Sequence, residues 1–252
     1  MGNIITAQLL KHIAPNANDN IIGDIEKFAD SAFEHYQINN YLRICHFIAQ
    51  AAEESDGFKT LQEYASGRAY EGRQDLGNVN PGDGVRYKGR GIFELTGRGN
   101  YADMSKILGV DLVNHPELAA TGEISLKIAL EYWNHRNLSA AADNDDINMI
   151  THRINGGYNG LATRQLYLDR AKAIVPKMIS FNVAAQVQPP IPSAPVPEVV
   201  PPAVIMPAKP AAISPAPVAK APAENENGIL DKVEDFLNND DQAKLIPPPK
   251  TA

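Results

Sequence analysis

The uneven distribution of proline is the feature that most restricts what this chain can fold into. Fifteen of the 19 prolines fall between Pro189 and Pro249, which leaves four in the first 188 residues. Proline lacks a backbone N–H and is excluded from helix interiors and central strands. The sequence therefore predicts a folded domain over residues 1–182 and a different kind of segment after it.

The last quarter of the chain divides into two parts. Residues 183–223 are dominated by Pro, Ala and Val, a composition that favours an extended, disordered linker and cannot form a packed core. Residues 224–252 form a tail with one possible short amphipathic helix, either a docking peptide for an unknown partner or a collapsed chain end. The apolar face of that helix would consist of Ile229, Leu230, Val233, Phe236 and Leu237.

Helical periodicity dominates the first 182 residues. Apolar residues recur at three- and four-residue intervals over 20–36, where Asn20 can cap the helix, and over 41–54, where Gly57 supplies the stop. Nine glycines between Gly67 and Gly99 predict a loop with at most a short hairpin. Since no run of alternating strands is evident, we expect one mainly α-helical domain. Further helices are predicted over 101–108, 123–135, 146–154 and 161–174, with Pro116 in a first helical turn.

Charge and cysteine content exclude several classes of protein. The net charge is −7 and neither part of the chain is basic, so we expect no nucleic-acid partner. The single cysteine, Cys45, excludes an intramolecular disulfide framework and a Cys-rich zinc site. His46 and His135 lack a matching cluster of metal ligands, so each is interpreted as a packed or hydrogen-bonded histidine. No metal and no cofactor are expected.

The N-terminal residues carry no pattern typical of a secretory signal peptide. They lack a basic start followed by a continuous apolar core, and no later stretch reaches the ~18 uninterrupted apolar residues of a membrane span. We therefore expect synthesis in the cytoplasm, no integral membrane segment, and release or export by another route.

Two glutamates are candidates for acid–base chemistry. Glu54 lies in the last turn of a predicted helix, where the negative end of the helix dipole and apolar neighbours would disfavour the ionised form. Glu63 follows the break at Gly57 and can fold back to face Glu54. Such a pair suits glycoside hydrolysis, in which one carboxyl group protonates the leaving oxygen and the other activates water. Solvated surface glutamates remain the alternative, and Glu71 could replace Glu63.

Several motifs occur in the order found in a known family. The chain resembles the glycoside hydrolase family 19 endolysins and chitinases over nearly all of residues 1–178, and the resemblance does not reach the proline-rich tail. The motifs that carry it are FIAQAAEESDGF at 47–58, EYASGRAYEGR at 63–73, GDGVRYKGRG at 82–91, LTGRGNY at 95–101 and INGG at 154–157.

The resemblance implies a lysozyme-like, two-lobed helical fold and inverting hydrolysis of β-1,4-linked N-acetylhexosamine polymers without metal or nucleotide. By the same resemblance, Glu54 is the general acid, Glu63 is the general base and Thr96 helps to hold the attacking water. The implied substrate-binding residues, some of which also orient the carboxylates, are Asn100, Asn155, Arg164, Tyr87 and Glu94.

The chain departs from the family pattern at two positions. Glu53 replaces a common His, and Glu94 replaces a common Gln. Glu53 could disfavour ionisation of Glu54 by like-charge repulsion or point to solvent. These changes leave the pH optimum and the substrate preference open.

The resulting prediction is a monomeric endolysin-type glycosidase that degrades bacterial peptidoglycan. It matches the endolysin branch better than secreted plant-type chitinases, whose disulfides Cys45 alone cannot supply. The alternatives are a chitinase acting on chitin oligomers, a lytic transglycosylase, and a non-catalytic glycan-binding protein whose site Glu53 and Glu94 have disabled.

Overall fold

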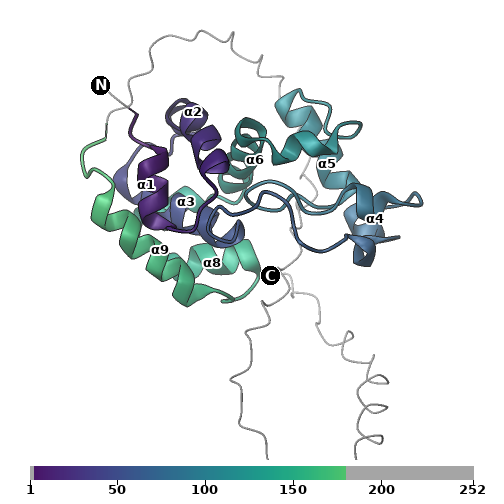
Figure 1. Ribbon diagram of the computed structural model, residues 1–252. Helices are drawn as coiled ribbons and strands as arrows, with labels where there is room; N and C mark the ends of the chain where they lie inside the picture. The colour runs from purple at the N-terminus through teal and green to yellow at the C-terminus, as the bar shows by residue number, and fades with distance from the viewer. Residues whose placement is uncertain (1–2, 180–252) are drawn as a thin grey trace, which may run out of the picture. The chain divides into compact units, whose positions relative to one another are not determined.

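The computed structural model describes residues 3–179, and within them the chain is mainly helical (Figure 1). The predicted linker over 183–223 and the tail over 224–252 lie outside the described residues. The α-helices are α1 (Ala7–Ile13), α2 (Asp19–His35), α3 (Tyr41–Glu54), α4 (Asp83–Arg86), α5 (Arg98–Leu108), α6 (Gly122–His135), α7 (Leu138–Asp143), α8 (Ile147–Asn155) and α9 (Leu161–Ile174). Short 3₁₀ turns occur at Arg68–Tyr70, Gln74–Leu76 and Pro116–Ala120.

Most of the predicted helices are present, with boundaries set by their caps. Helix α3 has the predicted bounds, and the N–H of Gly57, at φ +69°, closes its end by donating to the Ala52 carbonyl. The predicted cap of α2 was wrong. The side chain of Asn18, not Asn20, accepts from a helical N–H, so α2 begins one residue earlier than predicted and buries Ile22.

Two short helices, α1 and α7, were not predicted from the sequence. They have seven and six residues, less than two helical turns, so no repeating pattern of apolar residues can be recognised in them. Helix α1 is capped by Thr6, whose side chain accepts from the Leu9 N–H, and α7 follows Asn137 in a left-handed conformation. The glycine-rich segment is a loop, as predicted, interrupted by α4 and two 3₁₀ turns. The expected hairpin is reduced to isolated antiparallel bridges that join Gln62 to Arg90 and Arg90 to Leu95.

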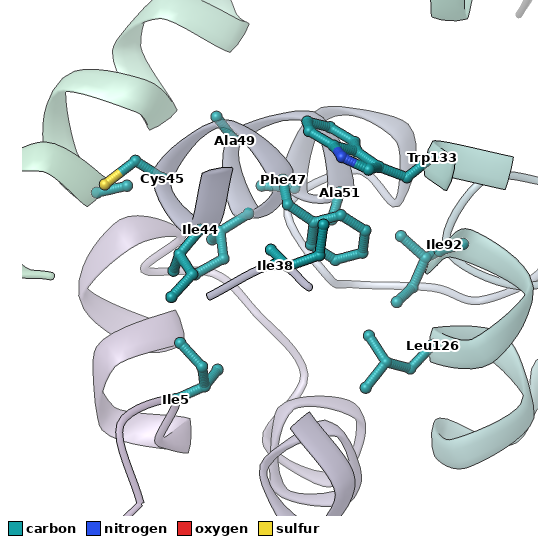
Figure 2. Packing of buried hydrophobic residues seen from close by; sticks show 14 of the residues in the cluster. Ile5, Ile38, Ile44, Cys45, Phe47, Ala49, Ala51, Ile92, Leu126 and Trp133 are labelled. Carbon is teal, nitrogen blue, oxygen red and sulfur yellow. The ribbon is translucent and has the colours of Figure 1, made fainter. Parts of the chain in front are cut away.

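The larger hydrophobic cluster is built around α3, which is buried along almost its whole length. Phe47 makes edge contacts with Phe33 at 5.1 Å and with Trp133 at 5.4 Å between ring centroids. Figure 2 shows Phe47, Trp133, Ile92 and Leu126 in this cluster. The cluster draws on α1, α2, α6, α7, α8 and α9, so α3 is the central element of the described domain.

A second, smaller cluster lies around α5, with Tyr87, Leu95, Tyr101 and Met104 as its main members. Ile128 of α6 belongs to it, while Leu126 and Trp133 of the same helix belong to the larger cluster. Helix α6 therefore contributes to both hydrophobic clusters, in agreement with the two-lobed fold predicted from the sequence. Figure 1 shows α4 and α5 at the opposite end of the described residues from α1 and α9.

None of the helices in residues 3–179 combines the length and the apolarity needed to cross a membrane.

Candidate active site

Glu54 lies at the end of the central helix α3 and is held by a buried arginine. The residue is 8% exposed, and its Oε1 accepts from Nη2 of Arg164 at 2.5 Å. Arg164, on α9, is 1% exposed and also donates from Nη1 to Oε1 of Gln50, one turn earlier on α3. The other oxygen of Glu54 makes no hydrogen bond within the described residues. Arg164 thus fixes one oxygen and leaves Oε2 for another partner.

Tyr132 lies near the same carboxylate, and its hydroxyl connects it to the end of α8, which carries Asn155. The Tyr132 hydroxyl donates to the Ile154 carbonyl at 3.3 Å. Burial, reinforced by the negative charge of Glu54, raises the pKa of Tyr132 to about 12. Asn155 ends α8 next to Ile154 and is 7% exposed, and its Oδ1 is buried without a hydrogen-bond partner in the described residues. A buried amide oxygen without a partner is costly, so this oxygen is available to an N–H donor of a ligand.

Glu63 lies on the glycine-rich segment and has a different set of partners. Its backbone N–H donates to the Gly89 carbonyl, and the Gly89 N–H donates back to Oε1 of Glu63 at 2.9 Å. The Tyr70 hydroxyl donates to Oε2 at 2.9 Å. Burial, followed by this hydrogen bond, raises the pKa of Tyr70, so its hydroxyl stays a donor. Since both oxygens accept from donors, the geometry fits an ionised carboxylate.

Thr96 and Glu94 meet Glu63 around Gly89. A methyl group added at Gly89 would lie 3.3 Å from Oγ1 of Thr96, 3.3 Å from Cβ of Glu94 and 3.4 Å from Cβ of Glu63. The Thr96 hydroxyl donates to the Glu94 carbonyl at 2.7 Å. Gly89 is therefore the point at which the predicted base, the predicted water-holding hydroxyl and Glu94 come together.

Asn100 is placed by the same segment. It lies in the first turn of α5, and its Nδ2 donates to the Thr96 carbonyl at 2.6 Å. The side chain thus reinforces the backbone that carries Thr96.

The loop between the two glutamates is folded back on itself. The Tyr64 hydroxyl donates to Oδ2 of Asp56 at 3.0 Å, which joins the residue after Glu63 to the loop just beyond Glu54. The Gly91 N–H donates to the Leu61 carbonyl, which anchors the same loop to the glycine-rich segment. Glu54 is thus supported by α3 and α9 of the larger cluster, and Glu63 by the segment that leads into the smaller one.

Tyr87 lies in the core of the smaller cluster. It is 1% exposed, its hydroxyl donates to the Val113 carbonyl at 3.0 Å, and its ring contacts the Tyr101 ring. The predicted substrate contact of Tyr87 thus has no exposed surface on which to form. In this structure Tyr87 supports the segment that carries Gly89.

Glu71, the alternative base, shapes a loop. Its two oxygens accept from the N–H groups of Gly82 and Gly84. Its side chain is exposed, in contrast to buried Glu63.

Glu53 is half-buried against α9. A methyl group at Gly160 would collide with its carboxylate, and its charge contributes to the raised pKa of Tyr167, which burial dominates. Glu53 therefore faces a different part of α9 from the Arg164 that holds Glu54.

The histidine interpretation is confirmed for His46, which is fully buried with Nε2 2.8 Å from Oδ1 of Asp145. Trp133 is fully buried in the larger hydrophobic cluster. Within residues 3–179, no three His, Cys, Asp or Glu side chains are grouped so that they could hold a metal ion.

Three residues of the site were missed in the sequence. Gln50 is a fully buried polar residue four positions before Glu54, a spacing that puts both on one helix face and could have been noticed. Tyr70 and Gly89 reach Glu63 only through the fold of the glycine-rich loop, and no periodic pattern indicates that.

A helical domain with two buried, separately supported carboxylates is typical of lysozyme-like glycoside hydrolases. The family model described as chitinase class I matches residues 17–148, slightly more than half of the chain. The chain belongs to glycoside hydrolase family 19. The matched range includes Glu54, Glu63 and Thr96, whereas Asn155 and Arg164 lie beyond it.

Individual relatives and structures agree with the family. A "glycosyl hydrolase family 19 domain-containing protein" of Haemophilus influenzae is 37% identical over 107 residues, covering 42% of this chain and 52% of that protein. Acidic endochitinase Q of Nicotiana tabacum is 27% identical over 147 residues, covering 53% and 55% of the two chains. This chain thus spans about half the length of these curated relatives.

The crystal structure of chitinase C from Streptomyces griseus superposes with a TM-score of 0.58 at 21% identity, covering 69% of this chain and 78% of that one. At this identity the likeness establishes the fold alone.

Replacing Gly89 with alanine tests whether the three groups around it work together. The added methyl group must displace Thr96, Glu94 or Glu63 by a few tenths of an ångström. Since small misplacements of catalytic groups are costly, we expect kcat to fall about 10-fold with the fold retained. Steady-state kinetics and thermal unfolding would check this. Gly23→Ala, on α2 with open space around it, is the matched control and should keep full activity.

Proposed function

We propose that this protein hydrolyses β-1,4 bonds between N-acetylhexosamines of bacterial peptidoglycan with inversion of configuration. Glu54 protonates the leaving glycosidic oxygen, Glu63 takes a proton from water, and Thr96 helps to hold that water. The Oδ1 of Asn155 accepts an N–H of the substrate. The proposal extends to the place of action, which is the cell wall after release of the protein from the cytoplasm.

The main support for the proposal is that the two buried glutamates differ in how their carboxylate oxygens are hydrogen-bonded. Glu54 has one oxygen without a partner in the described residues, as a proton donor to substrate requires, whereas both oxygens of Glu63 accept from donors. Water activated by Glu63 attacks the face opposite to the leaving group, as in inverting glycosidases.

We propose peptidoglycan as the substrate, and not chitin, because the sequence motifs resemble those of the endolysin branch. Chitin remains the second candidate, because relatives such as acidic endochitinase Q carry a chitinase name. Both polymers present the same bond, so the two candidates share one mechanism and differ in what surrounds the bond.

Incubation of the full chain with purified peptidoglycan and with chitin oligomers tests the substrate. Mass analysis is expected to find hydrolytic reducing ends from peptidoglycan. If the products carry mainly 1,6-anhydro ends, which are lighter by one water, the protein is a lytic transglycosylase and the assignment as a hydrolase is wrong. Cleavage of chitin oligomers alone would select the second candidate.

The stereochemistry of the product tests the mechanism independently. Attack by water from the opposite face gives a new reducing end that begins as the α-anomer. We expect NMR spectra recorded early in the hydrolysis of a chitin oligomer to show α-anomeric ends before mutarotation. Early β-anomeric ends would contradict the assignment of Glu63 as base.

A further inference from the structure

A small cavity lies where the loop between α1 and α2, the segment that follows α3, and α9 meet. Its volume is about 180 Å³, and its lining includes Gly57, Lys59, Tyr167 and Arg170. Since a water molecule occupies about 30 Å³ in the liquid, the cavity has room for a short side group of a ligand. None of these side chains takes part in the proposed hydrolysis.

Arg170 presents unused donors to this cavity. Its Nη1 donates to the Ile13 carbonyl at 2.9 Å, which fixes the guanidinium group between α9 and the end of α1. Its other N–H groups have no acceptor in residues 3–179. A guanidinium group held on one side with free N–H groups on the other is suited to a carboxylate, whose two oxygens match the fork.

Tyr167 adds a second donor. Its hydroxyl would lie 3.1 Å from a methyl group at Gly57, and it makes no hydrogen bond to a described residue. Burial, reinforced by the charges of Glu53 and Asp56, raises the pKa of Tyr167, so the hydroxyl keeps its proton. The absence of a side chain at Gly57 leaves the hydroxyl accessible.

The charge balance favours a singly charged ligand. Lys59 contributes a second cation, but its Nζ lies 3.2 Å from Oδ1 of Asp56, which offsets much of its charge. The carboxylate of Glu53 lies near Tyr167 as well. Arg170 makes no ion pair within residues 3–179, and beside two nearby carboxylates a monoanionic carboxylate is repelled less than a dianionic phosphate.

The cavity and the candidate active site share helix α9. Arg164, Tyr167 and Arg170 lie on successive turns of this helix, and Arg164 is the residue that holds Glu54. At about 1.5 Å per residue, Arg170 is about 9 Å along the helix axis from Arg164. A polysaccharide that extends past the cleaved bond can place a side group there.

We propose that this cavity binds a carboxylate of the substrate and so distinguishes peptidoglycan from chitin. The inference rests on the proposed function for its substrate and names the part of the substrate that is recognised. Chitin carries only neutral N-acetylglucosamine units. Peptidoglycan offers carboxylates from two sources, the lactyl group of N-acetylmuramic acid when it is free and the stem peptide when it is attached.

Binding is measured first, with the full-length Glu54→Gln variant so that turnover does not interfere. NMR titrations use N-acetylmuramic acid for the lactyl source, muramyl dipeptide for the peptide source, and N-acetylglucosamine as the uncharged probe. We expect at least one carboxylated probe to bind and Arg170→Gln to weaken it about 5-fold or more. Equal binding of all three probes, or no effect of Arg170→Gln, would overturn the proposal. Displacement by millimolar inorganic phosphate would overturn the carboxylate assignment.

Kinetics then separate this cavity from the catalytic site. In the otherwise unmodified chain, Arg170→Gln and Lys59→Gln are expected to raise KM about 5-fold on peptidoglycan with little change in kcat, and to leave KM on chitin oligomers unchanged. Arg170→Lys keeps the charge and should recover part of the loss. Lys27→Gln is the matched control. Lys27 lies on α2, outside the lining of the cavity, and it pairs with Asp24 three residues earlier, as Lys59 pairs with Asp56. Its replacement should change neither KM nor kcat.

The outcomes also separate this inference from the proposed function. Equal increases of KM on both polymers would show a structural role for Arg170 and overturn the inference, while the hydrolase assignment would stand. Binding of a carboxylated probe through Arg170 by a protein that fails to cleave peptidoglycan would support the cavity and overturn the proposed substrate.

Discussion

Replacing Glu54 with glutamine is expected to lower kcat about 1,000-fold, within the range that general acid catalysis contributes. The amide has no proton to transfer to the leaving oxygen. Its carbonyl can still accept the hydrogen bond from Arg164, so the contact between α3 and α9 survives as a hydrogen bond without the ion pair. Turnover of peptidoglycan or a chitin oligomer would be measured beside circular dichroism and thermal unfolding.

The control for Glu54→Gln is the same substitution at Glu53. Glu53 precedes Glu54 on α3 and faces Gly160, so its neutralisation should change kcat no more than about 3-fold. A folded Glu54→Gln protein with activity within 10-fold of the unmodified chain would remove Glu54 from the role of acid. A large loss at Glu53 alone would show that this neighbouring carboxylate takes part in catalysis.

Replacing Glu63 with glutamine is expected to lower kcat 100-fold or more, because the amide cannot accept a proton from water. The fold should tolerate the change. The amide oxygen can still accept from the Gly89 N–H, and the Tyr70 hydroxyl can rotate to accept from the amide nitrogen. Azide needs no general base, so it should restore product formation as a glycosyl azide, a rescue that a merely structural defect would not permit.

The matched variant for the base is Glu71→Gln. Glu71 binds the N–H groups of Gly82 and Gly84, so its replacement should loosen that loop and reduce kcat only a few fold. If Glu71→Gln proves the damaging substitution and azide rescues it, then the base is Glu71 and not Glu63.

Much of the helical framework could be predicted because its signals are local. The apolar period and the cap of α3 lie within about 17 consecutive residues, and Gly57 marks its end directly. The cap of α2 was misplaced because two asparagines stand two positions apart and only the geometry selects Asn18. Helices α1 and α7 are too short for a period to be visible.

The site was predicted less completely because its contacts are distant in sequence. The motifs drew attention to Glu54, Glu63 and Thr96 together. Which donors would reach them depends on loop conformation, and positive φ values recur throughout the glycine-rich segment, including φ +50° at Glu94. Tyr87 illustrates the limit, since a tyrosine in a motif can support the site from the core as easily as contact the substrate.

The link between Arg164 and Glu54 spans 110 positions of the chain. Ribosomal synthesis proceeds from the N-terminus, so the glutamate is made long before the arginine that holds it. A nascent chain that has not yet reached α9 contains both candidate glutamates, but Glu54 has neither its buried counter-charge nor the α9 face against which α3 packs. Completion of α9 is therefore the step at which the Glu54 carboxylate gains the support that it has in the folded domain.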